Sequence, residues 1–244
     1  MGYHWGKSFG GGQKSDMMFD KLRRVYSTWY RAIPFLQPVH LKVLRYRSGK
    51  LLDVGCGLIS PYRLYETFAD RFEYYGVDIQ DIRAYLPKAW HFTRLDVEKD
   101  LLPFPDDYFD VIIVSHIIEH LHYSVKALQE VRRVVKKGGL IYCEAPSLAS
   151  LLIPSISLGL PKVGTMNFYD DPTHIRPYSK VALTRLLEMS GFKVLKTGTH
   201  RNWLKVLASP GGVIIALVSR DRNLLASFMW DIFGFANFAV ATKV

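Results

Sequence analysis

The sequence predicts an α/β protein with a mostly parallel sheet, and three observations support this prediction. Short apolar runs alternate with helical patterns from residue 51 onward, a glycine-rich turn at 55–57 follows the first run, and 49% of the 244 residues are hydrophobic. Such alternation places helices on both faces of a parallel sheet. The composition also excludes disordered, collagen-like and coiled-coil chains.

Strands are expected wherever a short apolar run is bounded by turn residues. They are predicted near residues 51–54, 73–77, 91–95, 110–114, 139–145, 192–198 and 235–242. Helix signals lie between these runs. Ser60, Ser124 and Ser179 predict N-caps, and Gly138 and Gly191 are placed to end the helices that start at Ser124 and Ser179.

The chain is predicted to hold one globular domain at 49–244, preceded by a helical lid at 1–48. Apolar residues recur at helical spacing over 16–33, which indicates an amphipathic helix within the lid. Residues 146–178 and 199–234 are too long to be plain loops, so we expect them to build the substrate side.

Most of the net positive charge lies in the amino-terminal part. Residues 1–50 contain ten basic side chains and two acidic ones, which accounts for +8 of the formal net charge of +10. A basic segment interleaved with aromatic residues predicts contact with a phosphate-bearing substrate, an anionic membrane surface or nucleic acid. A solvated helix face is the alternative.

Two apolar stretches lie late in the chain. Lys205 interrupts 203–218, and Asp231 and Asn237 interrupt 224–240, so neither predicts a membrane-spanning helix. We expect both stretches to be core, with an interface-seeking surface as the alternative. Residues 1–13 carry no continuous apolar run, so no signal peptide is expected.

The two cysteines, Cys56 and Cys143, cannot form a disulfide framework or a four-sulfur zinc site. A reducing, cytoplasmic location is therefore expected, with peripheral membrane contact as an addition.

Three acidic residues lie at the carboxyl ends of the first three predicted strands. Asp53 precedes the glycine turn and suits a ligand with an ammonium group; Asp78 is placed to accept both hydroxyls of a ribose, and Asp96 to accept from an exocyclic amine. Singly, each is more often a solvated carboxylate at a strand end. Ser60 stands where a dinucleotide-binding turn needs its third glycine, which counts against a dinucleotide.

The chain at this point resembles the class I S-adenosylmethionine-dependent methyltransferases, over about residues 48–198 and the last ten. The matching motifs are Asp53-x-Gly55-x-Gly57, Asp78, Asp96, the segment 102–110 and the segment 128–139. The family usually carries glycine where Ile59 stands. The resemblance implies a Rossmann-like sheet of seven strands in the order 3-2-1-4-5-7-6 with the last strand antiparallel. It also implies S-adenosylmethionine as cofactor, held by Asp53, Gly55, Gly57, Asp78 and Asp96.

A His-x-x-Glu-His string lies at 116–120, after the fourth predicted strand. We reject the inverted zinc-protease reading because this segment sits in a strand-to-helix turn. It is similar to the Glu-His pair of small-molecule methyltransferases, including those of quinone biosynthesis. Some of these bind a divalent metal there through a first Glu, which His116 replaces, so no metal is predicted.

His120 is the candidate general base, with Glu119 as a second catalytic residue. The alternative is a packing histidine that Glu119 orients. Downstream, His174, Arg176 and Tyr178 are candidate substrate-binding residues, and the guanidinium suits a carboxylate or phosphate. In the alternative interpretation, Arg176 braces its loop by pairing with Asp170 or Asp171.

The predicted function is transfer of the methyl group of S-adenosylmethionine to an oxygen of a small or lipid-like acceptor. Nitrogen and carbon are less favoured acceptor atoms. The alternatives are an RNA methyltransferase that uses the basic arm and a non-catalytic scaffold that keeps the cofactor pocket. The predicted partners are therefore a small-molecule or lipid-like substrate and an anionic membrane surface, with nucleic acid less favoured.

Overall fold

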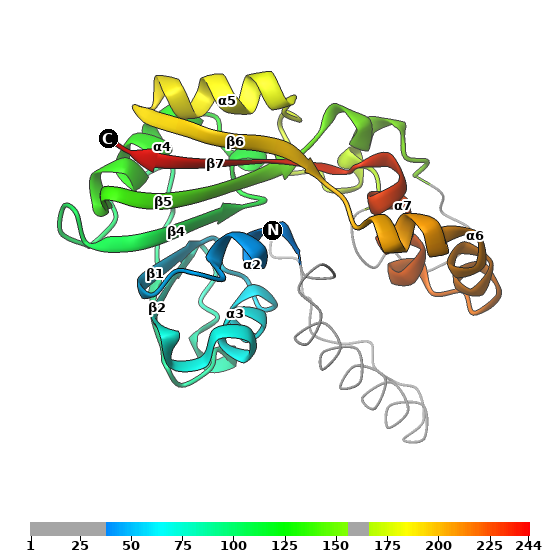
Figure 1. Ribbon diagram of the computed structural model, residues 1–244, viewed down its shortest axis with the longest axis horizontal. Helices are drawn as coiled ribbons and strands as arrows, with labels where there is room; N and C mark the ends of the chain where they lie inside the picture. The colour runs from blue at the N-terminus through cyan, green and yellow to red at the C-terminus, as the bar shows by residue number, and fades with distance from the viewer. Residues whose placement is uncertain (1–37, 156–165) are drawn as a thin grey trace. The chain divides into compact units, whose positions relative to one another are not determined.

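A twisted sheet runs through the molecule in the computed structural model, which describes residues 38–155 and 166–244 (Figure 1). The predicted lid helix at 16–33 lies outside the described residues. The strands are β1 (Gly49–Val54), β2 (Phe72–Asp78), β3 (Trp90–Arg94), β4 (Phe109–Ser115), β5 (Val135–Pro146), β6 (Phe192–His200) and β7 (Ala236–Lys243). Every predicted strand is therefore confirmed.

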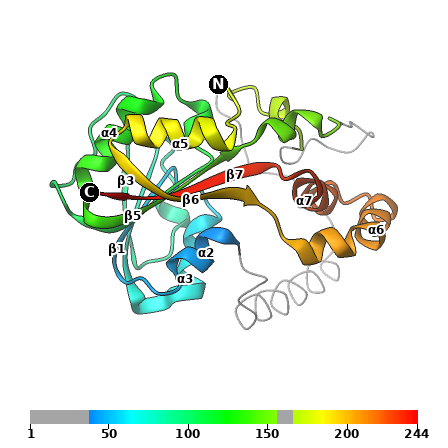
Figure 2. The same cartoon turned by 45° about the horizontal axis from the view of Figure 1, so that its top comes forward.

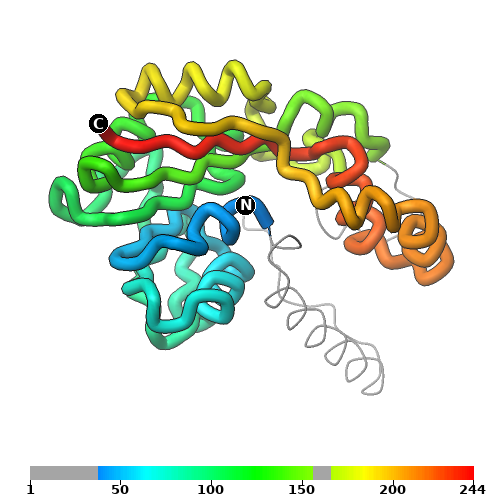
Figure 3. The backbone as a smooth tube through the Cα atoms, viewed as in Figure 1, coloured from blue at the N-terminus to red at the C-terminus, as the bar shows by residue number. Residues whose placement is uncertain are grey.

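The strand order is β3-β2-β1-β4-β5-β7-β6, as the resemblance implies. Neighbouring strands from β3 to β5 pair in parallel, and β7 runs antiparallel to both β5 and β6. Figure 3 traces β7 between these two strands. The order reverses between β1 and β4, and the carboxyl ends of strands at such a switch point are where ligands bind in open α/β sheets.

Helices cover both faces of the sheet, and two more lie beyond one end of it. The helices of the described residues are α2 (Val39–Leu44), α3 (Ser60–Phe68), α4 (Ser124–Val134), α5 (Lys180–Met189), α6 (Trp203–Val218) and α7 (Arg222–Phe233). Five short 3₁₀ segments join them within the described residues: η2 (Ala69–Arg71), η3 (Arg83–Tyr85), η4 (Ile118–His120), η5 (Leu148–Leu152) and η6 (Phe168–Asp170). Residues 38–155 and 166–244 belong to one compact unit. The predicted boundary at 49 stays a prediction.

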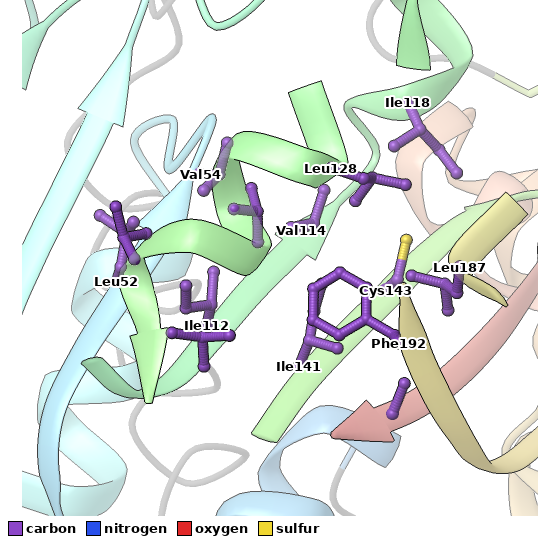
Figure 4. Close-up of a cluster of buried hydrophobic side chains, with 14 of the residues drawn as sticks. Leu52, Val54, Ile112, Val114, Ile118, Leu128, Ile141, Cys143, Leu187 and Phe192 are labelled. Atoms are coloured by element: carbon purple, nitrogen blue, oxygen red, sulfur yellow. The ribbon is translucent and has the colours of Figure 1, made fainter. Parts of the chain in front are cut away.

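The core has one layer on each face of the sheet. On one face, Leu128 of α4 and Leu187 of α5 pack with strand residues such as Ile112 and Cys143 (Figure 4). On the other face, α2 and α3 contribute Leu41, Leu44, Leu64 and Phe68. Cys56 and Cys143 are buried and free, so neither forms a disulfide.

Three of the predicted helix signals are wrong in detail. Helix α3 starts at Ser60 with Ile59 as N-cap, because the Ser60 hydroxyl donates to Asp53 and does not cap the helix. Tyr123, not Ser124, is the N-cap of α4, which ends at Val134; β5 then passes through Gly138. Ser179 does cap α5 by accepting from the Ala182 N–H, and Gly191 follows the end of α5 with a φ of +87°.

The insert at 199–234 forms two helices, α6 and α7, which lie side by side beyond one end of the sheet (Figures 1 and 2). Their shared core includes Ala216 and Leu225, together with Phe235 at the start of the return to β7. A Cβ on Gly212 would lie 2.1 Å from Cζ of Phe228, so glycine is needed for this close approach. No helix among the described residues is long and apolar enough to cross a membrane.

Candidate active site

The turn after β1 is hydrogen-bonded to β2 at the carboxyl edge of the sheet. The N–H groups of Gly55 and Cys56 both donate to the carbonyl of Val77, at 2.7 and 3.2 Å. Gly55 and Gly57 have φ values of +67° and +54°, which residues with a Cβ rarely adopt. The backbone of the turn therefore follows a path that depends on glycine.

Asp53 is a buried carboxylate with a neutral partner. Its side chain lies at the end of β1, is 2% exposed and accepts a hydrogen bond from Ser60 Oγ at 2.6 Å. Burial raises the pKa of Asp53 to about 7, with a smaller contribution from Asp78, while the Ser60 bond opposes the rise. No cationic side chain of the described residues forms an ion pair with Asp53, so a ligand with an ammonium group would supply the missing charge.

Asp78 at the end of β2 faces the same turn. Its Oδ2 accepts from the Gly57 N–H at 3.0 Å and its Oδ1 from the Gln80 N–H at 2.9 Å. An ionised carboxylate has about four acceptor positions, so two remain for hydroxyl groups. A Cβ on Gly57 would meet no atom within 4 Å, which leaves open space beside this carboxylate.

The backbone just before Asp96 is bonded to that of Asp78, because the Leu95 N–H donates to the carbonyl of Asp78 at 3.0 Å. The Asp96 carboxylate also stabilises the turn that follows it. It pairs with Lys99 Nζ at 2.8 Å and accepts a hydrogen bond from the Glu98 N–H at 3.0 Å. The hydrogen bond from Lys99 lowers the pKa of Asp96. Asp96 is therefore ionised and able to accept from an amine.

These groups fit S-adenosylmethionine. A buried carboxylate without a cation suits its ammonium group, and the carboxylate beside the glycine turn suits its ribose. Val97, Ile117 and Leu121 line an apolar cavity of about 10 Å³, which is too small to hold a purine, so the adenine contact rests on Asp96 alone.

His120 belongs to a chain of hydrogen bonds that sequence analysis missed. Thr173 Oγ1 donates to Asp171 Oδ1 at 2.6 Å and lies 2.8 Å from His120 Nδ1. Because the hydroxyl proton is used on Asp171, Thr173 accepts from Nδ1–H, which leaves Nε2 of a neutral imidazole as the basic nitrogen. Burial lowers the pKa of His120.

Glu119 does not orient His120, contrary to the alternative interpretation. It is fully buried, and its Oε1 lies 3.2 Å from His116 Nδ1. Its Oε2 is buried without a hydrogen-bond partner. Ligand atoms of Glu119, His120 and His174 lie within 4.8 Å of one another, so these three residues are the described group that could hold a metal ion. The prediction that no metal binds stays a prediction.

His116 links two buried carboxylates, a role the sequence did not reveal. Its Nδ1 and Nε2 lie 3.2 Å from Glu119 Oε1 and Glu144 Oε1, and Glu144 is also bonded to His200 Nδ1 at 2.9 Å. Burial alone would lower the pKa of His116, but the hydrogen bonds to both carboxylates raise it to about 10. His116 is therefore a cation with a strained φ of +56°. Only the positions of Glu144 and His200 at the ends of β5 and β6 could have indicated this cluster.

The candidate substrate residues lie on a segment tied to η4. Ile175 donates to the carbonyl of Glu119 at 2.8 Å, and Arg176 donates to the carbonyl of His122 at 3.0 Å. The His174 ring stacks on Phe168, and its Nδ1 lies 2.6 Å from the Phe168 carbonyl.

Arg176 and Tyr178 make contacts that the sequence did not predict. Arg176 bonds to carbonyl groups and not to Asp170, which instead lies 3.4 Å from Arg222. Tyr178 is 6% exposed, and its hydroxyl lies 3.1 Å from Ser124 Oγ. Its part in substrate binding stays a prediction, as do those of His174 and Arg176.

Comparisons with known proteins agree with this geometry. A family model described as "Methyltransferase domain" matches residues 23–197. The chain is similar to a probable S-adenosylmethionine-dependent methyltransferase of Mycolicibacterium smegmatis, with 29% identity over 74% of this chain and 66% of the relative. It is also 48% identical to the ubiquinone/menaquinone biosynthesis C-methyltransferase UbiE of Burkholderia mallei, over 52% of this chain and 51% of the relative.

Other curated relatives are also only partly covered. The chain spans 43% of an uncharacterized methyltransferase of Schizosaccharomyces pombe, at 29% identity over 44% of this chain. Among solved structures, a SAM-dependent methyltransferase from Archaeoglobus fulgidus has the same fold, with a TM-score of 0.56, 24% identity, and coverage of 93% of this chain and 99% of that one. The chain belongs to the methyltransferase-domain family and is a class I S-adenosylmethionine-dependent methyltransferase with S-adenosylmethionine as cofactor.

Proposed function

We propose that the protein transfers the methyl group of S-adenosylmethionine to an oxygen of a small or lipid-like acceptor, with His120 as general base. The observation that supports this proposal is the chain of hydrogen bonds from Asp171 through Thr173 to His120, which leaves Nε2 free to accept a proton. The sulfonium of the bound cofactor supplies an activated methyl group. The protein has to position the acceptor, exclude water and take up a proton.

The residues around His120 have roles that follow from their charges. Proton uptake would make His120 an imidazolium, and the buried carboxylate of Glu119 would stabilise that cation. Glu119 is held in place by His116. His174 and Arg176 lie on the segment that is hydrogen-bonded to η4 and would contact the acceptor from there. Tyr178 would hold this segment in place through its bond to the carbonyl of Ile118.

Carbon is a second candidate for the acceptor atom, because one relative is described as a C-methyltransferase. An aromatic carbon made reactive by a neighbouring hydroxyl would need the same base, which removes the hydroxyl proton. The RNA alternative rests on the basic arm, most of which lies outside the described residues.

The test is labelling with a methyl-tritiated donor in a cell extract that contains small molecules, lipids and RNA. We expect label in the small-molecule or organic fraction, as an ether or ester for oxygen and as a ring methyl for carbon. His120→Gln should lower this labelling by about 100-fold or more, the usual contribution of a general base, while affinity for S-adenosylhomocysteine stays the same.

His122→Gln is the matched control, because His122 is an exposed histidine two positions away and should keep full activity. Full turnover in His120→Gln would exclude His120 as the base. Label confined to a fraction that ribonuclease removes would instead favour the RNA methyltransferase.

A further inference from the structure

Helix α6 exposes its apolar side to solvent and turns its polar side toward the protein. In a helix at the surface of a globular protein, the apolar side faces the core and the polar side faces water. Only Ala216 of the sixteen residues of α6 is buried, so the expectation that 203–218 is core is wrong. Leu207 and Val218 are 76% and 81% exposed.

All exposed residues of α6 lack a polar side chain. They are Trp203, Leu204, Leu207, Ala208, Pro210, Gly211, Ile214, Ile215, Leu217 and Val218. With 3.6 residues per turn, they share about half of the helix circumference and extend over its whole length of about 24 Å. We call this surface the outer face of α6.

The polar residues of α6 point the other way. Lys205 Nζ lies 2.7 Å from Ser227 Oγ and 3.3 Å from Asp231 Oδ2, both on α7. Water solvates an ammonium group well, so a lysine on an exposed helix usually points into solvent. The ammonium group of Lys205 instead points toward α7. Gly212 is also on this inner side, where it meets Phe228.

We propose that the outer face of α6 docks on the surface of an anionic lipid bilayer. Protein interfaces carry about one hydrogen bond per 100–200 Å² and a polar rim. The outer face offers no side-chain donor or acceptor along its whole length, except the indole N–H of Trp203 at one end, which favours acyl chains over a protein partner. The helix is too short to span a bilayer, so it would lie in the plane of the interface.

The ends of α6 carry the groups that anchor interfacial helices. Trp203 is at the amino end, with the Arg201 guanidinium 5.4 Å from its ring centroid, and Arg220 is exposed just past the carboxyl end. Tryptophan and basic side chains favour the headgroup region, and α6 itself carries no acidic residue. The charge of these ends therefore complements anionic headgroups.

The position of α6 links this surface to the site. Helix α6 begins at Trp203, directly after β6, whose last residue is His200 in the carboxylate cluster of the site. Docking would thus bring the carboxyl edge of the sheet toward the lipid surface. The proposal extends the proposed function but does not depend on the acceptor, since vesicle binding is measured without turnover.

The experiment is co-sedimentation of the full chain with vesicles of phosphatidylcholine and phosphatidylglycerol. Leu207→Glu with Ile214→Glu should weaken partitioning at least about tenfold, because two apolar side chains no longer enter the bilayer. The control pair is Val181→Glu with Met189→Glu, which are 61% and 70% exposed on α5 and should bind as the wild type does. Trp203 fluorescence should shift to the blue on vesicles, and Trp203→Phe should lose that shift.

Every variant must also keep its thermal stabilisation by S-adenosylhomocysteine, which shows that it is folded and separates this test from the proposed function. The proposal is overturned if the wild type stays in the supernatant, or if the α6 pair binds vesicles as well as the α5 pair does. The second result would assign binding to another part of the chain, such as the basic arm. A dimer in sedimentation velocity that the α6 pair dissociates, without vesicle binding, would assign the outer face to self-association and would also overturn it.

Discussion

At the scale of single residues, charge decides which side chains can serve the cofactor and which serve the fold. Asp53 is buried against a neutral hydroxyl, whereas Glu144 is buried against two histidines and is already neutralised. A buried carboxylate that lacks a cation is costly unless a ligand supplies one. Asp53 is therefore the group whose ionisation should change on cofactor binding.

This difference predicts how cofactor affinity depends on pH. The pKa of Asp53 is raised to about 7, and an ammonium group beside it would lower that pKa in the complex, so binding releases a proton below about pH 7. Affinity for S-adenosylhomocysteine should thus fall roughly tenfold between pH 7.5 and pH 6. Calorimetry in two buffers of different ionisation enthalpy measures both the affinity and the proton release.

Asp53→Asn is the control for this pH dependence. It should bind S-adenosylhomocysteine weakly at both pH values, with no proton release, because the titrating group is gone. An affinity of the wild-type protein that is the same at pH 6 and pH 7.5 would show that Asp53 does not meet the ammonium group.

At the scale of elements, the strands were predictable and the contacts between their ends were not. A buried parallel strand is a continuous apolar run, so the sequence pattern is strong for β1, β2 and β4. Asp53 and Asp78 lie at the carboxyl ends of two such strands, so their approach could be inferred. Thr173 lies 53 positions from His120, and no local pattern connects the two.

The predictions of an N-cap at Ser60 and of a buried α6 were wrong for related reasons. A serine before a helix has two uses, and Ser60 bonds to Asp53 because that buried carboxylate needs a donor more than the helix needs a cap. The apolar composition of α6 predicts burial, but composition does not tell whether protein or another apolar phase covers it.

The glycine turn after β1 allows stability and cofactor affinity to be separated. A Cβ on Gly55 would lie 1.8 Å from Ile117 Cδ1, whereas one on Gly57 would meet nothing within 4 Å. Both have positive φ, so each substitution by alanine costs about 1–2 kcal/mol in backbone strain. Gly55→Ala should cost about 3 kcal/mol in total because of the overlap. Gly57→Ala should cost only the strain but weaken cofactor binding, since its methyl group enters the open space.

The double variant Gly55→Ala with Ile117→Ala tests the source of the larger cost. Removing the Ile117 branch relieves the overlap, so the double-mutant cycle in urea unfolding should show a coupling energy of opposite sign to the single losses. Equal unfolding free energies for Gly55→Ala and Gly57→Ala would contradict the role given to Ile117.

At the scale of the whole molecule, the sheet separates two surfaces with different chemistry. The cofactor residues lie at the carboxyl ends of β1, β2 and β3 in one half of the sheet, and the α6–α7 insert lies between β6 and β7 in the other half. The candidate base and the cluster of Glu144 and His200 lie at strand ends between them. The proposed lipid-like acceptor would thus enter from one side while the cofactor binds on the other.

This separation predicts two distinct footprints in hydrogen exchange. S-adenosylhomocysteine should slow exchange in 53–60 and 76–80, where backbone N–H groups surround the site, and leave 203–218 unchanged. Anionic vesicles should slow exchange in 203–218, because a docked helix opens less often than one exposed to water, and leave 53–60 unchanged. If either ligand protects both regions to the same extent, the two surfaces are coupled, and the α6–α7 insert takes part in cofactor binding itself.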